Sequence, residues 1–274
     1  MSERRRSPPT RRELLMVGAA AATSVAGRPA RADQPAQVST PGRAPPRFGL
    51  VIDLDRCTRC QACVVACAAE NNVPPLGSHV SALSRPIHWM DMLVPHGDGV
   101  VPGLDDHPLP IPCMHCEEPP CVSVCSVGAI YLADDGIVAQ IWDRCIGCRA
   151  CMVVCPYGRR YYNWSPPVWP GGDASAANPD VAMRPAGIVE KCTLCHHRVR
   201  ARFERARLDE EFVLDEELQH LSACAETCPA EAIKFGDLSD EKSAVARLAS
   251  SPRAVRLLDR LGTLPKVFYL RRMR

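Results

Sequence analysis

The sequence predicts an α+β fold with an internal repeat, in which a short strand enters a cysteine-rich loop and a short helix leaves it. Sixteen cysteines fall into four groups, and three of these groups share one compact spacing. Apolar, β-rich runs flank the groups, and short helical stretches follow the cysteines directly. Because this order of elements recurs, we expect an internally repeated α+β architecture.

The cysteine groups carry most of the information in this chain. The first and third groups have the same spacing, with intervals of two, two and three residues, and the second is a looser version of it. The fourth group is split into two pairs by a gap. In chain order the groups are Cys57, Cys60, Cys63 and Cys67; Cys113, Cys116, Cys121 and Cys125; Cys145, Cys148, Cys151 and Cys155; and Cys192, Cys195, Cys224 and Cys228.

The elements around the first group are predicted from hydrophobic pattern. Residues 48–54 are apolar and β-rich, so we expect a strand that brings Asp55 and Arg56 to the first cysteine loop. Residues 62–70 then read as a short helix that begins within the group itself.

Similar elements accompany the later groups. Residues 129–141 hold two β-rich runs around Asp135-Gly136, a pattern typical of a hairpin. Residues 187–191 lead into the fourth group, and residues 232–235, after its last cysteine, are predicted to form another strand.

Three insertions interrupt the repeat, and a further segment follows it. Residues 68–112 show little pattern, and residues 156–187 are rich in Tyr and Trp. Residues 196–223 contain a basic helical run, 196–208, and an acidic one. The acidic run spans residues 209–217, and the C-terminal segment, 239–274, is predicted to hold two short amphipathic helices and then an extended stretch.

Four groups of four thiols match the ligand demand of four [4Fe–4S] clusters, with no cysteine left over. A cluster of this kind needs three thiolates that converge from one loop, and a cysteine at every third position supplies them. The fourth cysteine already lies in the helix that leaves the loop. In two-cluster ferredoxins such a cysteine ligates the other cluster.

Zinc and disulfides are the alternatives. A structural zinc ion is usually held by two pairs of cysteines on separate turns, and a third cysteine three residues later is surplus for a tetrahedral ion. Disulfide scaffolds are usually short chains, and cysteines this close along a turn pair poorly with each other. The spacing favours iron–sulfur clusters, and a zinc-binding structural protein is kept as the alternative of another class.

Composition limits both the core and the function. Aromatic residues make up only 5% of the 274, so the clusters themselves are expected to serve as part of the core. The first 32 residues hold seven Arg and two Glu, which leaves 26 basic and 29 acidic residues, a net of −3, in the rest. That balance gives no basic stripe for nucleic acid. No phosphate-binding loop, nucleophile elbow or acid–base pair is visible, so we expect no catalytic site and no small-molecule substrate.

The N-terminus is predicted to be an export signal. Residues 1–32 combine an Arg-rich start, a short apolar stretch and the sequence Ala30-Arg31-Ala32, which is typical of a cleavage site. The Arg11-Arg12 pair followed by Leu14 and Leu15 resembles a twin-arginine signal. Clusters are built in the cytoplasm, so a protein that carries them must be exported folded. A plain basic tail, or a signal kept as an anchor, is the alternative. Residues 33–47 form a Pro-rich linker.

Four motifs together resemble a known family. They are Ile52-Asp-Leu-Asp-Arg-Cys57 with the following Ala66-to-Pro74 stretch, Cys113-Met-His-Cys116 with Glu-Glu-Pro-Pro-Cys121, the run from Asp143 to Tyr157, and Glu190-Lys-Cys-Thr-Leu-Cys195. This set resembles the four-cluster, ferredoxin-type iron–sulfur subunits of membrane-associated molybdopterin oxidoreductase complexes of the dimethyl sulfoxide, tetrathionate, polysulfide and nitrite reductase types. Subunits of alternative complex III, of sulfur-metabolism transmembrane complexes and of exported hydrogenases are similar.

The resemblance implies an architecture and a set of partners. Two interleaved bacterial-ferredoxin-like modules are expected, one from residues 48–95 and 188–238 and the other from residues 96–187, with residues 239–274 as a C-terminal tail. The implied partners are a catalytic molybdopterin-type subunit and a multi-span, quinone-interacting membrane subunit. The chain itself would be a non-catalytic electron carrier on the periplasmic side of the cytoplasmic membrane.

The resemblance also implies which cysteines share a cluster, because the last cysteine of each group crosses to a partner group. Cluster 1 would use Cys57, Cys60, Cys63 and Cys228; cluster 2, Cys67, Cys192, Cys195 and Cys224; cluster 3, Cys113, Cys116, Cys121 and Cys155; and cluster 4, Cys125, Cys145, Cys148 and Cys151. Some relatives replace the residue that matches Cys148 and hold a three-iron cluster, so a cysteine here predicts a four-iron one.

Other conspicuous residues are expected to support the clusters. His115 is predicted to lie behind the ligands or in solvent, since cysteines already serve its loop. His196-His197 is expected on a partly exposed helix face. The aromatic stretch from Tyr157 to Trp169, with Arg159 and Arg160, is expected to pack around a cysteine loop, with a partner-facing role as the alternative.

Overall fold

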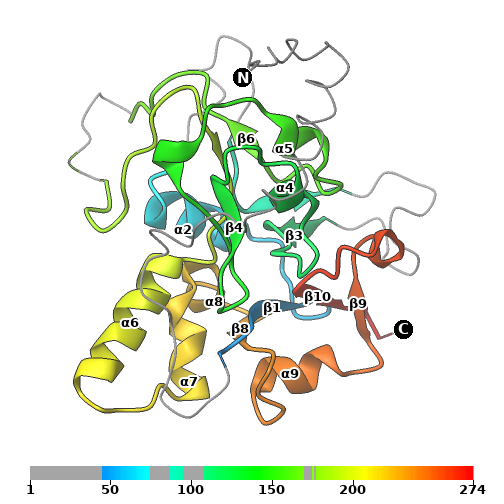
Figure 1. Cartoon of the computed structure of the whole chain (residues 1–274). Helices are drawn as coiled ribbons and strands as arrows, with labels where there is room; N and C mark the ends of the chain where they lie inside the picture. The colour runs from blue at the N-terminus through cyan, green and yellow to red at the C-terminus, as the bar shows by residue number, and fades with distance from the viewer. Residues whose placement is uncertain (1–44, 75–86, 95–107, 170–174, 176, 274) are drawn as a thin grey trace, which may run out of the picture. The chain divides into compact units, whose positions relative to one another are not determined.

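The framework of the fold is a small mixed sheet with β-strands drawn from both ends of the described chain (Figure 1). The structure, a computed structural model, describes residues 45–74, 87–94, 108–169, 175 and 177–273. These residues belong to one compact unit, Ala36–Arg274. The predicted export signal and most of the Pro-rich linker lie outside the described residues.

The sheet has the strand order β8-β1-β10-β9. Its strands are β1 (Phe48–Asp53), β8 (Ile233–Asp237), β9 (Ala254–Arg256) and β10 (Val267–Leu270). Strand β1 pairs antiparallel with β8, with Leu50 opposite Phe235, and parallel with β10, with Leu50 opposite Val267. The predicted strands at 48–54 and 232–235 are therefore neighbours.

The alternation of side chains along β1 explains how the sheet is buried on both faces. Phe48, Leu50 and Ile52 face the main hydrophobic core, where the Phe48 ring stacks on Phe235 with centroids 5.5 Å apart. Val51 faces the other way and packs beneath α9 (Ala244–Ala249), which covers that side of the sheet (Figure 1). Burial on both faces accounts for the nearly continuous apolar run in this strand.

Two helices carry the cysteines of the first and fourth groups. Helix α2 (Ala62–Glu70) has the bounds predicted from sequence, and it packs on α8 (Ala223–Glu226). Helix α6 (His196–Leu208) also has its predicted bounds. Glu70 at the end of α2 forms an ion pair with its Arg198 and a hydrogen bond with its His197. The contact joins the first cysteine group to the fourth across a long stretch of sequence.

The middle of the chain forms short elements around the second and third groups. The predicted hairpin is present as β4 (Ile130–Leu132) and β5 (Val138–Gln140), followed by a 3₁₀ turn, η1 (Trp142–Arg144). Helices α4 (Pro120–Ser123) and α5 (Ala150–Val153) pack against each other. A ribbon of β6 (Tyr161–Tyr162) and β7 (Val189–Glu190) then leads into the fourth group.

Two expectations about the insertions and the C-terminal segment were wrong in detail, and one insertion without a sequence pattern contains strands. The acidic run is helical only at its end, in α7 (Asp215–Leu218), and a 3₁₀ turn, η4 (Gln219–Leu221), follows it. Residues 68–112 include a ribbon of β2 (Asp91–Leu93) and β3 (Leu109–Ile111). The C-terminal segment holds one α-helix, α9; strand β9 and a 3₁₀ turn, η5 (Asp259–Leu261), stand where a second helix was expected. Strands of three residues are too short to show a sequence pattern, so their formation depends on pairing with a neighbouring strand.

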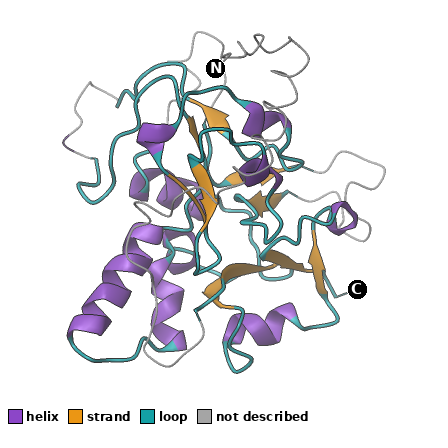
Figure 2. Ribbon diagram, in the orientation of Figure 1, coloured by secondary structure: helices purple, strands orange, loops and turns teal. Residues whose placement is uncertain are grey.

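The segment after residue 239 is part of the framework, since β10 lies between β1 and β9 in the sheet. Loops connect most of these short elements, as Figure 2 shows. The fold is a mixture of helices and strands, as predicted. The division into two interleaved modules remains a prediction, because backbone contacts group Ala36–Arg274 as one unit.

Candidate metal centres

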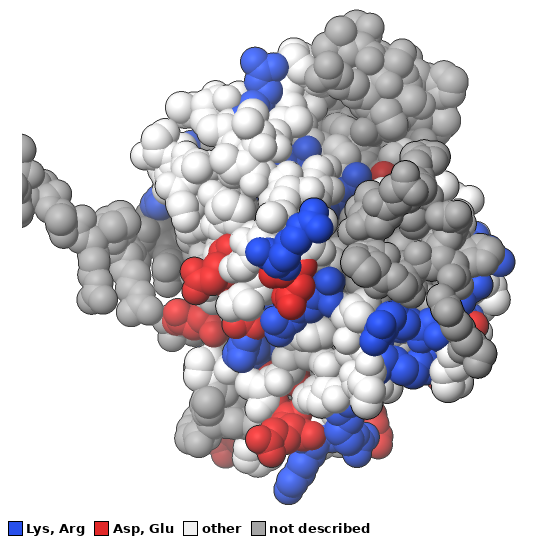
Figure 3. Space-filling model, turned by 90° about the vertical axis from the view of Figure 1, so that its right-hand side faces the viewer, with Lys and Arg blue, Asp and Glu red and all other residues white. Residues whose placement is uncertain are grey.

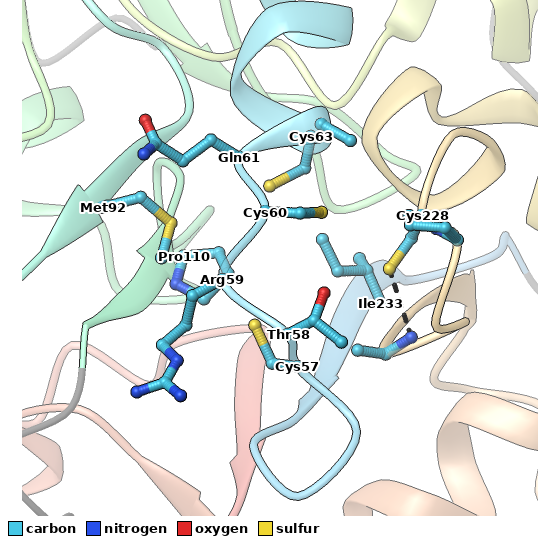
Figure 4. Close-up of a pocket in the computed structure, with 13 residues that line it drawn as sticks. Cys57, Thr58, Arg59, Cys60, Gln61, Cys63, Met92, Pro110, Cys228 and Ile233 are labelled. Atoms are coloured by element: carbon cyan, nitrogen blue, oxygen red, sulfur yellow. Dashed lines mark hydrogen bonds between the residues drawn. The ribbon is translucent and has the colours of Figure 1, made fainter.

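The first set of thiols surrounds one cavity. Cys57, Cys60 and Cys63 come from the loop after β1 and the start of α2, and Cys228 comes from the segment between α8 and β8. The four line one cavity that opens to solvent. Figure 4 shows their sulfur atoms around the same space. Burial, and then the thiolates of Cys57 and Cys228, raise the pKa of Cys63 to about 12.

The second set brings the last cysteine of the first group to the fourth group. Complete burial raises the pKa of Cys67 well above its usual value, and the thiolates of Cys192, Cys195 and Cys224 raise it further. The Asn71 amide donates to Cys67 Sγ at 3.7 Å and to Cys195 Sγ at 3.8 Å. Cysteines far apart in sequence therefore share one hydrogen-bond donor.

The third and fourth sets exchange cysteines in a similar way. Burial raises the pKa of Cys116 to about 12, and the thiolates that raise it further are Cys113, Cys121 and Cys155. Of these, Cys155 belongs to the third group in sequence.

In the fourth set, burial raises the pKa of Cys151 to about 11, against the lowering effect of Arg160. The thiolates of Cys121, from the third set, and of Cys145 and Cys125 raise it as well. Cys125 belongs to the second group in sequence. Cys148 lies in the same loop as Cys145 and is exposed.

Each cysteine loop bends in the same way. The residue before the second cysteine has a positive φ in all four loops: 60° at Arg59, 42° at His115, 67° at Gly147 and 53° at Leu194. A left-handed conformation costs a residue other than glycine about 1–2 kcal/mol, so a repeated one indicates a functional constraint. At Gly147 a side chain would also collide with the carbonyl oxygen of Gly187.

Backbone amides point at several of the sulfur atoms. An N–H donor aimed at sulfur stabilises the thiolate form, which is the form that binds iron. Three such donors are Leu194 N to Cys192 Sγ at 3.4 Å, Ala232 N to Cys228 Sγ at 3.3 Å, and Val189 N to Cys145 Sγ at 3.5 Å.

These sites suit an iron–sulfur cluster better than a single ion. All sixteen cysteines are free thiols. Among the residues that the structure describes, no three His, Cys, Asp or Glu side chains are arranged to hold one metal ion. A tetrahedral ion needs its ligands gathered at one atom, whereas the thiolates of a [4Fe–4S] cluster each bind a different iron and stand further apart. The four mixed sets of thiols therefore fit [4Fe–4S] clusters.

Neighbouring sets lie close enough to act on one another. Electrostatic effects on cysteine pKa values link adjacent sets at three places, so set one is next to set two, two to three, and three to four. The linking pairs are Cys63 with Cys224, Cys113 with Cys192, and Cys121 with Cys151. The cysteines of set two are all buried, and the exposed cysteines, Cys60 and Cys148, belong to sets one and four.

His115 has a definite structural role. It is 0% exposed, so the prediction that allowed a solvent-facing position is replaced by the buried one. Its Nε2 lies 3.0 Å from the carbonyl oxygen of Cys192, and Val138 N donates to its Nδ1 at 3.2 Å. Burial lowers its pKa well below the usual value, which keeps the ring neutral. The neutral ring ties the second cysteine loop to the fourth.

A buried polar network supports the strand that enters the fourth group. Glu190 and Arg184 form an ion pair in which each side chain is 2% exposed. Trp89 Nε1 and Asn163 Nδ2 each donate to Glu190 at 3.0 Å. Arg184 also stacks on the Trp89 ring at 4.7 Å and donates to the carbonyl oxygen of Asn72 at 2.8 Å. The network thus joins two insertions directly before Cys192.

The aromatic stretch after the third group mainly packs, as predicted. The Tyr157 hydroxyl lies 2.6 Å from Thr263 Oγ1, and Arg159 pairs with Asp91 at 3.1 Å. Trp164 is 41% exposed and lies near Arg149, whose guanidinium carbon is 5.2 Å from the ring centroid. His196 and His197 are partly exposed, also as predicted.

The surface seen in Figure 3 carries basic and acidic side chains close together, without a continuous basic stripe on that face. No helix within the described residues is both long enough and apolar enough to cross a membrane.

Comparison with known proteins agrees with this chemistry. A family model described as a 4Fe-4S dicluster domain matches residues 106–186, and a 4Fe-4S binding domain model matches residues 48–69. The chain is 45% identical to the menaquinone reductase iron–sulfur cluster-binding subunit of Nitratidesulfovibrio vulgaris, over 82% of this chain and 89% of that protein. It belongs to this family of iron–sulfur subunits. Family membership identifies it as an electron-transfer subunit that carries [4Fe–4S] clusters, and its sixteen cysteines fit four such clusters.

Two further members of the family are similar over most of their length. A putative dimethyl sulfoxide reductase iron–sulfur subunit of Halobacterium salinarum is 40% identical, over 81% of this chain and 78% of that protein. The Hdr-like menaquinol oxidoreductase iron–sulfur subunit 1 of Archaeoglobus fulgidus is 34% identical, over 94% of this chain and 96% of that protein. As a member of the family, the chain is not itself the catalytic subunit of its complex.

Sequence reasoning missed the buried charges around these sites. Lys191 is 0% exposed and Lys266 is 1% exposed, although lysine is rarely buried. The position of Lys191 beside Cys192 was a visible signal, but the burial of Lys266 depends on β10, whose place in the sheet was not predicted.

Proposed function

We propose that this chain relays electrons through four [4Fe–4S] clusters between a catalytic molybdopterin-type subunit and a quinone-reactive membrane subunit. The observation that carries the proposal is the exchange of cysteines between groups. The neighbours of Cys67 are Cys192, Cys195 and Cys224, and Cys155 is a neighbour of Cys116. Such an exchange holds pairs of clusters close together, which a relay requires.

The proposed ligands follow the four mixed sets of thiols. Cluster 1 is bound by Cys57, Cys60, Cys63 and Cys228; cluster 2 by Cys67, Cys192, Cys195 and Cys224; cluster 3 by Cys113, Cys116, Cys121 and Cys155; and cluster 4 by Cys125, Cys145, Cys148 and Cys151. For cluster 4, the assignment of Cys148 rests on its position in the loop between Cys145 and Cys151.

The contacts between sets support a linear order from cluster 1 to cluster 4. Each set acts electrostatically on the next. The exposure of Cys60 and Cys148 supports a position near the surface for the two terminal clusters. Electrons therefore enter near one exposed cysteine and leave near the other, and the buried set two keeps its cluster away from water.

The family and the N-terminus support the proposed partners and location. Relatives include subunits of a menaquinone reductase and of a menaquinol oxidoreductase, which supports a quinone-interacting partner. The twin-arginine pattern at Arg11-Arg12 supports export of the folded protein to the periplasmic side of the membrane. By the resemblance to such complexes, we further propose that the first two clusters face the catalytic subunit and the last two the membrane subunit.

The test is purification of the chain with its native partners from membranes, followed by rapid mixing with a reduced menaquinone analogue. The proposal expects co-purification of a molybdopterin-containing subunit and a multi-span subunit. It also expects the clusters to become reduced within one turnover, seen as bleaching of their visible absorption. A complex that turns over while the clusters remain oxidised would contradict a relay.

A further inference from the structure

Three cationic side chains are buried around the third set of thiols. Lys191 is 0% exposed, Lys266 is 1% exposed and Arg160 is 4% exposed. They come from separate parts of the chain: the end of the β6–β7 ribbon, the residue before β10 and the segment before β6. Burying a charge is costly unless an opposite charge compensates it, so this arrangement needs an explanation.

The hydrogen bonds of the two lysines go to neutral atoms. Lys191 Nζ donates to the carbonyl oxygen of Cys192 at 2.8 Å, and Lys266 Nζ donates to the carbonyl oxygen of Gly136. A carbonyl oxygen satisfies a donor but does not neutralise its charge. The buried Asp135 carboxylate acts electrostatically on Lys266, but Lys191 and Arg160 need another source of compensation.

The contacts of Arg160 indicate that the cysteine ligands of set three supply this compensating negative charge. Its Nη2 donates to Cys121 Sγ at 2.9 Å, and its Nη1 donates to Gln140 Oε1 at 3.3 Å. The thiolate of Cys113 acts electrostatically on Arg160 and on both lysines. The three cations thus converge on one set of ligands.

The other sets have different surroundings. Set two receives hydrogen bonds from neutral groups, the Asn71 amide and the Ser222 hydroxyl, which lies 3.1 Å from Cys224 Sγ. Sets one and four each include an exposed cysteine, Cys60 or Cys148, so water can screen nearby charges. Lys191 also acts on Cys192 of set two, and Arg160 on Cys151 of set four, but within the described part of the chain the three cations act together only on set three.

We propose that the cluster held by Cys113, Cys116, Cys121 and Cys155 has the highest reduction potential in this chain, and that Lys191, Lys266 and Arg160 raise it. This inference rests on the proposed ligand sets. Reduction adds one negative charge to a cluster that is already anionic. Buried cations stabilise that added charge strongly, because the surroundings screen them little.

With this assignment, a single electron in the chain occupies the third cluster at equilibrium. The third cluster would be the first to be reduced as potential falls, although it lies inside the series and not at either end. An electron that enters at either terminal cluster would therefore settle there until the partner subunit accepts it. Lys191 acts electrostatically on cysteines of both set two and set three, so it affects electron transfer between the second and third clusters.

The test is a redox titration of the purified complex, followed by electron paramagnetic resonance. Cys116→Ser identifies the signal of the third cluster, because only that signal should change. In Lys191→Met, the same signal should titrate at a lower potential, with the reduction equilibrium changed at least about tenfold, or 59 mV for one electron. Lys191→Arg keeps the charge and should leave the potential close to wild type.

The controls separate charge from structure. Lys242 is exposed, so Lys242→Met removes the same charge at the surface and should shift no cluster. Iron content is measured first, and if Lys191→Met loses iron, the titration is made with Lys266→Met. The inference is overturned if the third cluster titrates below another cluster, or if the titrated lysine variant leaves its potential unchanged. An intact set of clusters with unshifted potentials would overturn this inference alone, whereas a protein without clusters would overturn the proposed function as well.

Discussion

Replacing Arg184 with methionine is expected to destabilise the fold and loosen the fourth cysteine group. Arg184 and Glu190 form a buried ion pair, and Glu190 stands two residues before Cys192. Methionine keeps most of the volume of the side chain but removes its charge and its donors. Glu190 would retain the hydrogen bonds from Trp89 and Asn163 and lose its only buried cation within this network.

The structure allows the size of the effect to be estimated. Removing one partner of a buried ion pair costs about 3–5 kcal/mol, because the other charge remains buried without compensation. The stacking of Arg184 on Trp89 and its bond to the Asn72 carbonyl oxygen are lost too. For a domain of this size, 1 kcal/mol corresponds to about 2–4 °C in Tm, so the melting temperature should fall by roughly 6–20 °C.

The assay is thermal melting of the holo-protein followed by circular dichroism, with visible absorption as a second signal for loss of the clusters. Arg207→Met is the matched control, since Arg207 pairs with Glu204 on the exposed side of α6. This control should melt like the wild type. If Arg184→Met and Arg207→Met melt at the same temperature, the buried network does not support the fourth group and the reasoning is wrong.

Three further changes test other parts of the account. Cys67→Ser should disturb the cluster of the fourth group and spare the cluster of its own loop, as seen by resonance spectra. Serine is a harder ligand, so that cluster should become labile or shift in potential; a change confined to the first loop would contradict the exchange of ligands. Changing Arg11 and Arg12 to Lys should retain the protein, with its clusters, in the cytoplasm, which cell fractionation measures. Normal accumulation of this variant in the periplasm would contradict the twin-arginine prediction. Gly147→Ala should lower the free energy of unfolding more than Gly128→Ala does, as denaturant melts would measure. The backbone φ is positive at both residues, but only at Gly147 would the added Cβ collide with a backbone carbonyl oxygen. Equal losses would mean that this collision does not affect stability.

The parts of the fold that local sequence decides were predicted well. Helices α2 and α6 begin and end where their patterns indicated, and the hairpin turns at Asp135-Gly136. The repeated cysteine spacing predicted the candidate sites, because ligand spacing within a loop is a local property. In each case neighbouring residues alone carry the necessary information.

Features that depend on distant contacts were not predictable in the same way. Strand β10 lies where it does because it pairs in parallel with β1, and the sequence of residues 267–270 alone does not indicate that partner. The positive φ values at Arg59 and Leu194 run against the preference of those residue types, so only Gly147 gave a local sign of the bend. The convergence of the buried lysines on set three likewise requires the folded chain.

The content of iron and acid-labile sulfide per chain is the measurement that tests the central claim most directly. The purified holo-protein should contain about 16 iron atoms and a matching amount of sulfide, as four [4Fe–4S] clusters require. About 15 iron atoms with a paramagnetic signal in the oxidised protein would mean that one cluster has three irons, against the role assigned to Cys148. About four zinc atoms and no iron would contradict the account, because four C4 zinc sites would then explain the cysteines.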